Sequence, residues 1–313
     1  MKGLELARQY YEAFGKEMLR DGFAEITAFL AVGLAGSGSE CYGYDDESSR
    51  DHDFEPAFCI FLPGEDVVDR RTAFLLERAY AKLPKDFMGL RRCPLDPVGG
   101  SRHGVIRMAD FFLEKTGSPD GVLTVQQWFE APEYGLLEAT NGAVFADPYG
   151  QFTAIRERLR YFPEDVRRKK LAGHLLLMGQ AGQYNYSRCI ARGETAAAQL
   201  AVFEFVQSAL HSVFLLNRAY MPYYKWSFRG LRELSQLHEL GQDLEFLLCS
   251  GNSPGEAERK TESIEMICTA IAEQLRVQKL TDLQTAEMEQ QAYALNETIT
   301  DHNIRNLHIL CGT

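Results

Sequence analysis

Two aspartates with one residue between them, Asp51 and Asp53, stand just before an apolar segment. On a β-strand, side chains two residues apart point to the same face, so the two carboxylates would project together. Like charges this close repel each other unless a cation lies between them, and Mg²⁺ with oxygen ligands is the usual cation. A pair of such ions can stabilise the attacking and leaving oxygens of a phosphoryl transfer. Asp51 and Asp53 are therefore the candidate catalytic residues and the candidate ligands of Mg²⁺ or Mn²⁺.

A turn of small residues precedes the two acids. Ser37, Gly38 and Ser39 would offer backbone N–H groups and hydroxyls to phosphate oxygens that approach closely. Alone, a GSGS turn is usually a flexible connection and an acid-x-acid pair is usually solvated. Their order is more specific: the turn, twelve residues from Ser39 to Asp51, the acid pair, and then the apolar run 57–62. Together these features predict a nucleoside-triphosphate site with metal.

This order resembles the nucleotidyltransferase superfamily that includes DNA polymerase beta and the aminoglycoside nucleotidyltransferases. Gly38-Ser39 and Asp51-His52-Asp53 match its GS turn and acid-x-acid pair, and residues 33–63 and 215–231 (LLNRAYMPYYKWSFRGL) are similar to a bacterial branch of it. The resemblance implies transfer of a nucleoside monophosphate from an NTP to an acceptor, with release of pyrophosphate. ATP is the default donor on grounds of abundance. The acceptor stays open between a small hydroxyl or amino compound and a protein side chain.

A third carboxylate, on a later strand, often serves this superfamily as metal ligand or general base. The strand expected within 103–112 (HGVIRMADFF) carries no acid, and we expect Asp110 to cap the helix that follows. Glu138 and Asp147 are further candidates. Because this acid is missing, an alternative interpretation stays open: a non-catalytic protein with a nucleotidyltransferase-like fold that binds nucleotide or a partner. A dinucleotide-binding fold is disfavoured, because the sequence has GxxGxG where that fold needs GxGxxG opening into a helix.

Basic residues of the second half are weaker candidates. Lys225, in MPYYKWSF, would either close on the triphosphate as a point charge or lie on the surface with its stem along aromatic rings. Arg188 and Arg192 share a helix face, which we interpret as solvated, and we interpret the basic run 167–170 in the same way.

The elements that must position these residues change along the chain. In the first half we expect helices, the buried strand 57–62, a strand at 104–108 and a hairpin over 136–147. Strand signals then vanish, and we expect helices at 151–161, 164–181, 194–220, 228–248, 255–278 and 281–298. The sequence thus predicts an α+β protein, with a nucleotidyltransferase domain containing a mixed sheet over residues 1–150 and a helical bundle over 151–313.

Charge and composition limit the partners. Residues 1–150 carry 15 Lys and Arg against 25 Asp and Glu, which argues against a nucleic-acid partner.

The apolar stretch 195–217 has a polar stripe at helical spacing, as in a buried helix rather than a membrane span. Seven scattered cysteines without a CxxC pair, and an N-terminus without an apolar signal segment, predict a cytoplasmic protein with reduced thiols. The oligomeric state stays open.

Overall fold

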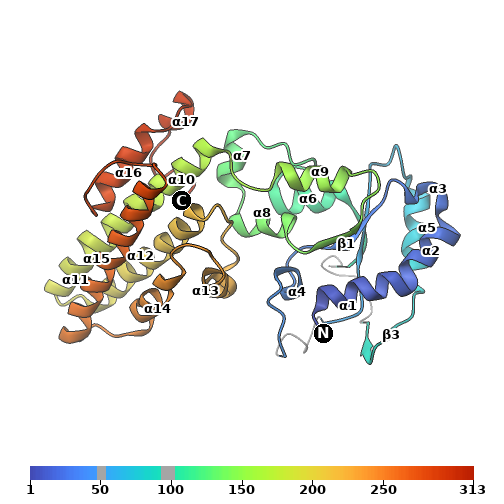
Figure 1. The fold of residues 1–313 in the computed structure, drawn as a ribbon, viewed down its shortest axis with the longest axis horizontal. Coiled ribbons are helices and arrows are strands. Elements are labelled where there is room, and N and C mark those ends of the chain that lie inside the picture. The colour runs from blue at the N-terminus through green and yellow to red at the C-terminus, as the bar shows by residue number, and fades with distance from the viewer. Residues whose placement is uncertain (48–53, 93–102) are drawn as a thin grey trace. The chain divides into compact units, whose positions relative to one another are not determined.

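The computed structural model describes residues 1–47, 54–92 and 103–313, so Asp51 and Asp53 lie outside the described residues. The chain divides into two compact units (Figure 1). The first contains residues 1–127 and 135–160, and the second contains residues 128–134 and 161–313. The predicted domain limits, 1–150 and 151–313, stay a prediction.

The first unit combines helices with a small mixed sheet. Its β-strands are β1 (Ala31–Leu34), β2 (Cys59–Leu62), β3 (Asp86–Phe87), β4 (Leu90–Arg91), β5 (Gly104–Arg107) and β6 (Ala143–Ala146). Its helices are α1 (Gly3–Tyr10), the π-helical turn η1 (Tyr11–Gly15), α2 (Lys16–Gly22), α3 (Ala24–Thr27), α4 (Ser39–Tyr42), α5 (Arg70–Ala81), α6 (Met108–Thr116), α7 (Val125–Glu130), α8 (Glu133–Thr140) and α9 (Gln151–Arg158). Residues 128–134, which include parts of α7 and α8, belong to the second unit.

The four-stranded sheet has the order β5-β2-β1-β6, in which β2 is parallel to β5 and β1 is antiparallel to both β2 and β6. Strand β2 is interior and buried throughout, as the apolar run predicts. Ile60 and Leu62 belong to a core with Tyr10 of α1 and Leu76 of α5. Phe61 points to the other face, where its ring stacks on Phe152 of α9 at 4.1 Å between ring centroids. Helices therefore cover both faces of β2.

The hairpin predicted over 136–147 is wrong. Residues 133–140 form helix α8, and only Ala143–Ala146 form a strand, β6, which pairs with β1. Asn141-Gly142 does make a tight turn, with φ of +68° at Gly142, but it joins a helix to a strand. A side chain at Gly142 would overlap the Leu34 carbonyl oxygen, so the glycine is required by close packing against β1 as well as by its φ.

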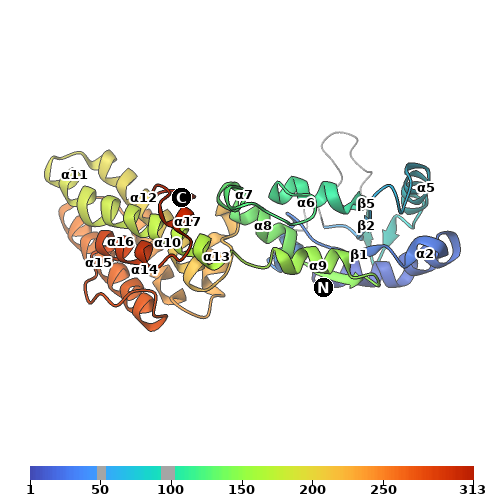
Figure 2. The same cartoon turned by 90° about the horizontal axis from the view of Figure 1, so that it is seen from above.

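The second unit is helical in all its described elements (Figure 2). It contains α10 (Glu164–Met178), the π-helix η3 (Gly179–Tyr186), α11 (Ser187–Ala191), α12 (Thr195–Leu216), α13 (Tyr224–Arg232), the 3₁₀ turn η4 (His238–Leu240), α14 (Gly241–Cys249), α15 (Pro254–Val277), α16 (Met288–Glu297) and α17 (His302–Arg305). The α+β class, with a mixed sheet followed by helices, is confirmed. The single helix predicted at 228–248 is wrong, because the chain breaks there into α13, η4 and α14.

Helices α10 and α12 form the centre of the second unit, where α10 packs on α12, η3 and α16. Helix α12 is long and apolar enough to cross a membrane by length and composition alone, yet 61% of its most apolar window is buried inside the protein. It packs on α14 and α15 as well. The expectation of a buried core helix is therefore confirmed.

The interpretation of the basic run 167–170 as a solvated face is wrong. Arg167, Lys169 and Lys170 are all at most 5% exposed. The Lys169 ammonium donates to Asn296 Oδ1 at 2.9 Å and to the carbonyl oxygens of Arg305 and Leu307 at 3.0 and 2.7 Å. Three neutral oxygens thus replace the water that the buried ammonium loses. The basic residues tie α10 to the C-terminal segment of the chain.

Candidate functional site

Four connections of the chain meet at one end of the four-stranded sheet. Because β1 and β2 are antiparallel with Gly33 opposite Cys59, the end of β1 lies beside the start of β2. Strand β5 is parallel to β2 with Gly104 opposite Cys59, so it starts at the same end. Strand β6 starts there too, with Ala143 opposite Leu34. We call this place, defined by Leu34, Cys59, Gly104 and Ala143, the motif end of the sheet.

The GSGS turn leaves β1 at the motif end and is fixed by Asn141. The Asn141 side chain accepts from the Gly36 N–H at 2.9 Å and donates to the Gly36 carbonyl at 2.8 Å. Gly36 is buried with φ of +125°, a conformation that side chains rarely adopt. Ser37 is exposed and Ser39 half-buried, and neither hydroxyl has a hydrogen-bond partner among the described residues. The turn therefore presents polar groups while its backbone is held.

Two carboxylates flank a buried histidine beside the turn. Glu40 follows Ser39 at the start of α4, and Glu55 and His103 precede β2 and β5 at the motif end. His103 Nδ1 lies 3.0 Å from Glu55 Oε1, and His103 Nε2 lies 3.9 Å from Glu40 Oε1. Glu40 and His103 are buried. The Glu40 carboxylate also packs so closely on Gly38 that a side chain at Gly38 would overlap it.

The three candidates for a third carboxylate differ in their surroundings. Asp110 is exposed in the first turn of α6, whose N-cap residue is Arg107, so the expected capping role of Asp110 is wrong. Asp147 accepts from the backbone N–H groups of Gly150 and Thr153 at 3.1 and 2.8 Å, which fixes the start of α9. Both acids thus have local surroundings that need no metal.

Glu138 joins three helices of the first unit. Its carboxylate lies 2.9 Å from Lys115 Nζ of α6 and accepts from the Tyr42 hydroxyl of α4 at 3.1 Å. Burial first, and then the Glu138 charge, raise the pKa of the Tyr42 hydroxyl well above its ordinary value. Tyr42 therefore remains a neutral donor to Glu138. Because both carboxylate oxygens have protein partners, this geometry favours a positioning role for Glu138 over metal binding.

Lys225 lies in the first turn of α13, in the second unit, and is exposed. Its ammonium lies 5.4 Å from the centroid of the Trp226 ring, and it has no carboxylate partner in the described chain. This is the surface position along aromatic rings, and it leaves the charge accessible to solvent. Arg188 and Arg192 are exposed, as interpreted from the sequence, and Arg188 contacts Tyr184.

Sequence reasoning missed Glu40, Glu55, His103 and Asn141. Glu55 continues the spacing of Asp51 and Asp53 by two further residues, so the period of two was a usable signal for it. Glu40 directly follows the turn, which is a weaker signal. His103 and Asn141 come from segments far along the chain, and only the strand order brings them to the motif end.

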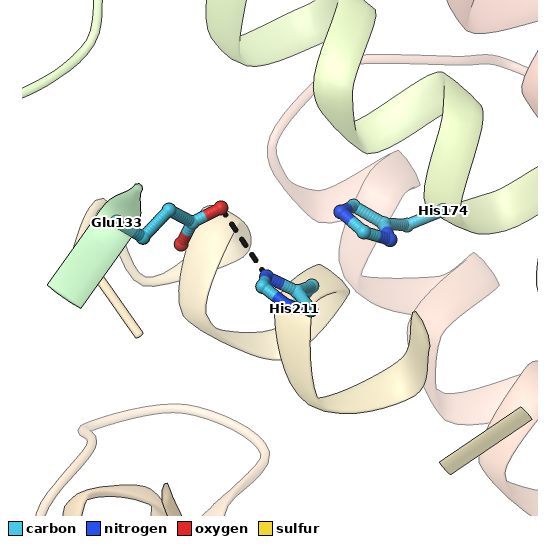
Figure 3. Close-up of side chains that lie close together, drawn as sticks. All are labelled: Glu133, His174 and His211. Atoms are coloured by element: carbon cyan, nitrogen blue, oxygen red, sulfur yellow. Dashed lines mark hydrogen bonds and ion pairs between the residues drawn. The ribbon is translucent and has the colours of Figure 1, made fainter. Parts of the chain in front are cut away.

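A separate group in the second unit has the chemistry of a metal site. One ligand atom from each of Glu133, His174 and His211 lies within 4.8 Å of the others (Figure 3). Glu133 accepts from the Met221 N–H at 3.1 Å and contacts His211 Nδ1 at 3.2 Å. Burial raises the pKa of Glu133, but His211 and Lys170 outweigh burial and bring it below its ordinary value. This group of residues fits a divalent metal.

Comparison with known proteins adds three findings. A family model described as a domain of unknown function (DUF4037) matches residues 128–227. A crystal structure of a nucleotidyltransferase-like protein from Exiguobacterium sibiricum is similar over 90% of this chain and 89% of that chain, with 11% identity and a TM-score of 0.37. No curated protein matches the chain. A structural similarity this low carries no argument about activity, so the functional interpretation rests on the motif and on the motif end of the sheet.

Proposed function

We propose that the protein is a metal-dependent nucleotidyltransferase that moves a nucleoside monophosphate, AMP by default, from an NTP to an acceptor. In the reaction, an acceptor oxygen or nitrogen forms a bond to the α-phosphorus. The bond from that phosphorus to the bridging oxygen of the β-phosphate breaks, pyrophosphate leaves with the electron pair, and the proton of the acceptor hydroxyl or amine passes to water. The acceptor is a small hydroxyl or amino compound or a protein side chain. We place the protein in the cytoplasm.

The convergence at the motif end carries this proposal. The motif has two halves, the GSGS turn after β1 and the acid pair before β2, and antiparallel pairing brings the end of β1 and the start of β2 together. The proposal assigns the triphosphate to Ser37, Gly38 and Ser39 and its metal ion to Asp51 and Asp53, which precede β2 in the sequence. The hydroxyls of Ser37 and Ser39 suit this role, because phosphate gains hydrogen bonds there without breaking any to the described residues.

The donor atoms near the motif end fit a hard divalent cation. The described groups there include the carboxylates of Glu40 and Glu55, which flank the His103 ring, and the hydroxyls of Ser37 and Ser39. Mg²⁺ would supply charge neutralisation on the phosphates and on the leaving pyrophosphate. Asp51 and Asp53 would bind it. Lys225, whose charge is accessible to solvent, stays a proposed nucleotide-binding residue.

Calorimetric titration of the full chain with a non-hydrolysable ATP analogue and Mg²⁺ tests the proposal. Asp51→Asn and Asp53→Asn should each weaken metal-dependent binding strongly, because each removes a charged oxygen ligand. Asp86→Asn is the matched control, since Asp86 is an exposed acid on β3 of the same unit. Parental affinity in both motif variants would contradict the proposal.

Ser39→Ala supplies a second test at the turn. The free protein loses no hydrogen bond to the residues that the structure describes, so its stability should stay within about 0.5 kcal/mol of the parent. A hydrogen bond to a charged phosphate contributes about 1.5–3 kcal/mol, which corresponds to roughly a 10- to 150-fold loss of NTP affinity.

A non-catalytic nucleotide-binding or partner-binding protein is the second candidate. The described strand β5, Gly104–Arg107, carries no acid, so the position where this superfamily often places its third carboxylate is not acidic. Pyrophosphate release from ATP with Mg²⁺ and candidate acceptors distinguishes the two. Tight, Asp53-dependent ATP binding without release across a broad acceptor panel would favour the binding protein.

A further inference from the structure

The interior of the second unit holds a histidine whose polar atoms have no partner. His174, on α10, is 5% exposed, and neither of its ring nitrogens has a hydrogen-bond partner in the part of the chain that the structure describes. Buried polar side chains are almost always hydrogen-bonded, and an exception calls for an explanation such as an ion or a water. The ring nitrogens therefore point to a ligand.

Two further ligand groups stand beside His174. The His211 ring, from α12, is parallel to the His174 ring to within 2°, with 4.4 Å between centroids. Glu133, the first residue of α8, turns its carboxylate toward His211 (Figure 3). All three ligand atoms lie within 4.8 Å of one another. Three separate helices thus bring two imidazoles and one carboxylate to one point inside the second unit.

We propose that Glu133, His174 and His211 bind one divalent transition-metal ion of the zinc class. Two imidazole nitrogens and one carboxylate oxygen are a ligand set that suits Zn²⁺ and its neighbours, whereas Mg²⁺ prefers oxygen ligands with water. The His211 side chain is 24% exposed, which leaves a route for the ion and for a fourth ligand from solvent. This site is independent of the proposed nucleotidyl transfer, which uses Asp51, Asp53, the GSGS turn and Lys225.

The stacked rings define a movement that metal binding requires. A metal binds an imidazole nitrogen along its lone pair, which lies in the ring plane. Two parallel, stacked rings share no such plane, so one ring must turn. His174 is enclosed, and His211 is the partly exposed one. Metal binding therefore rotates the His211 ring away from the His174 ring. The direct contact between His211 and Glu133 Oε1 is then replaced by bonds from both side chains to the same ion.

Two neighbours act on the carboxylate. The Met221 N–H donates to Glu133 Oε2 and orients the carboxylate, as outer-shell groups do in metal sites. Lys170 Nζ lies 3.8 Å from Glu133 Oε1, also donates to the Gly312 carbonyl, and lies over the Phe162 ring. Its positive charge opposes an incoming cation. Lys170→Met should therefore increase the metal affinity.

Titration of chelator-treated full-length protein with Zn²⁺ and with Co²⁺ tests the proposal. The parent should bind one ion, and the Co²⁺ complex should show visible d–d bands without the intense near-ultraviolet bands of cobalt–thiolate bonds. His174→Phe should weaken binding at least about 100-fold while the ring volume in the stack is kept. His238→Gln is the matched control, because His238 is an exposed histidine of the same unit, and its affinity should be parental.

His211→Gln keeps the test decisive if His174→Phe does not fold. His211 is only partly buried, so this variant should fold and should also weaken Zn²⁺ binding by at least about 100-fold. The proposal is overturned by a parent that binds no Zn²⁺, by cobalt–thiolate bands, or by parental affinity in His211→Gln. The same histidine variants should bind Mg²⁺–ATP with parental affinity. Failure of the zinc-site proposal therefore gives a different result from failure of the nucleotidyl-transfer proposal.

Discussion

Removal of the Asn141 side chain should release the GSGS turn. In Asn141→Ala, both the Gly36 N–H and the Gly36 carbonyl lose their partner, at 2.9 and 2.8 Å in the parent. A net hydrogen bond contributes about 0.5–1.5 kcal/mol, and a buried group left unsatisfied costs about 1–3 kcal/mol. Gly36 is buried but Asn141 is only half-buried, so water can reach part of the gap. We therefore expect a loss of about 2–4 kcal/mol in the local stability of the turn.

Hydrogen exchange measured on peptides of residues 35–42 is the appropriate assay. A loss of about 2–4 kcal/mol corresponds to roughly a 30- to 1000-fold faster exchange of the protected amides. Global unfolding followed by tryptophan fluorescence is a poorer measure, because Trp128 and Trp226 both belong to the second unit. Peptides of α15 in that unit supply the internal reference and should exchange at the parental rate.

Two variants separate the two hydrogen bonds from other effects. Asn141→Asp keeps an oxygen that accepts from the Gly36 N–H but loses the donor to the Gly36 carbonyl, so its exchange should lie between the parent and Asn141→Ala. Ser37→Ala, next to Gly36, removes no hydrogen bond from the described protein and should exchange as the parent does. A parental exchange rate in Asn141→Ala would refute the claim that Asn141 holds the turn. Faster exchange combined with parental Mg²⁺–ATP affinity would show that the order of the turn does not matter for nucleotide binding.

Three other perturbations have defined outcomes. Gly182→Ala places a Cβ against the Phe205 ring and should cost about 1–3 kcal/mol in urea unfolding, whereas Gly255→Ala, with open space around it, should cost nothing. Burial raises the pKa of Glu164, but its arginine partners bring it down to about 2. Its stabilisation is therefore full above about pH 4.5 and lost as the pH falls through about 2, so the melting-temperature difference between parent and Glu164→Gln should vanish over that range. Lys225→Ala should leave stability unchanged and lower the transfer rate by roughly 10²–10³, with partial rescue by Lys225→Arg; a parental rate would remove Lys225 from the chemistry.

Strand β2 and helix α15 were predictable because their signals are local. The apolar run at 57–62 has no charged residue, and strand β2 lies within it. Helix α15, Pro254–Val277, begins where the sequence has Ser253, Pro254 and Glu256, and the structure has the capping box that this pattern indicates. Local sequence therefore determines both elements, with little dependence on contacts to the rest of the fold.

The errors arose where tertiary contacts outweighed local preference. Asn141-Gly142 is a good hairpin turn by composition, yet residues 133–140 are helical, and the turn instead holds Gly36 and packs on Leu34. Charged side chains at 167–170 are typical of a surface, but carbonyl oxygens more than a hundred residues away accept from Lys169. No pattern within ten or twenty residues contains that information.

The two candidate metal sites can be distinguished by ligand chemistry. At the motif end, the proposed ligands Asp51 and Asp53 and the serine hydroxyls of the GSGS turn are oxygen donors, which suit Mg²⁺ and the phosphates of an NTP, and the His103 ring there already contacts Glu40 and Glu55. The group in the second unit offers two imidazoles and one carboxylate, which suit a borderline ion such as Zn²⁺. Millimolar Mg²⁺ should therefore leave the His174 site unaffected, and one equivalent of Zn²⁺ should leave Mg²⁺–ATP binding unaffected. A contrary result would be a variant at one site that abolishes both Zn²⁺ binding and Mg²⁺–ATP binding. That result would mean that the two metal sites do not function independently.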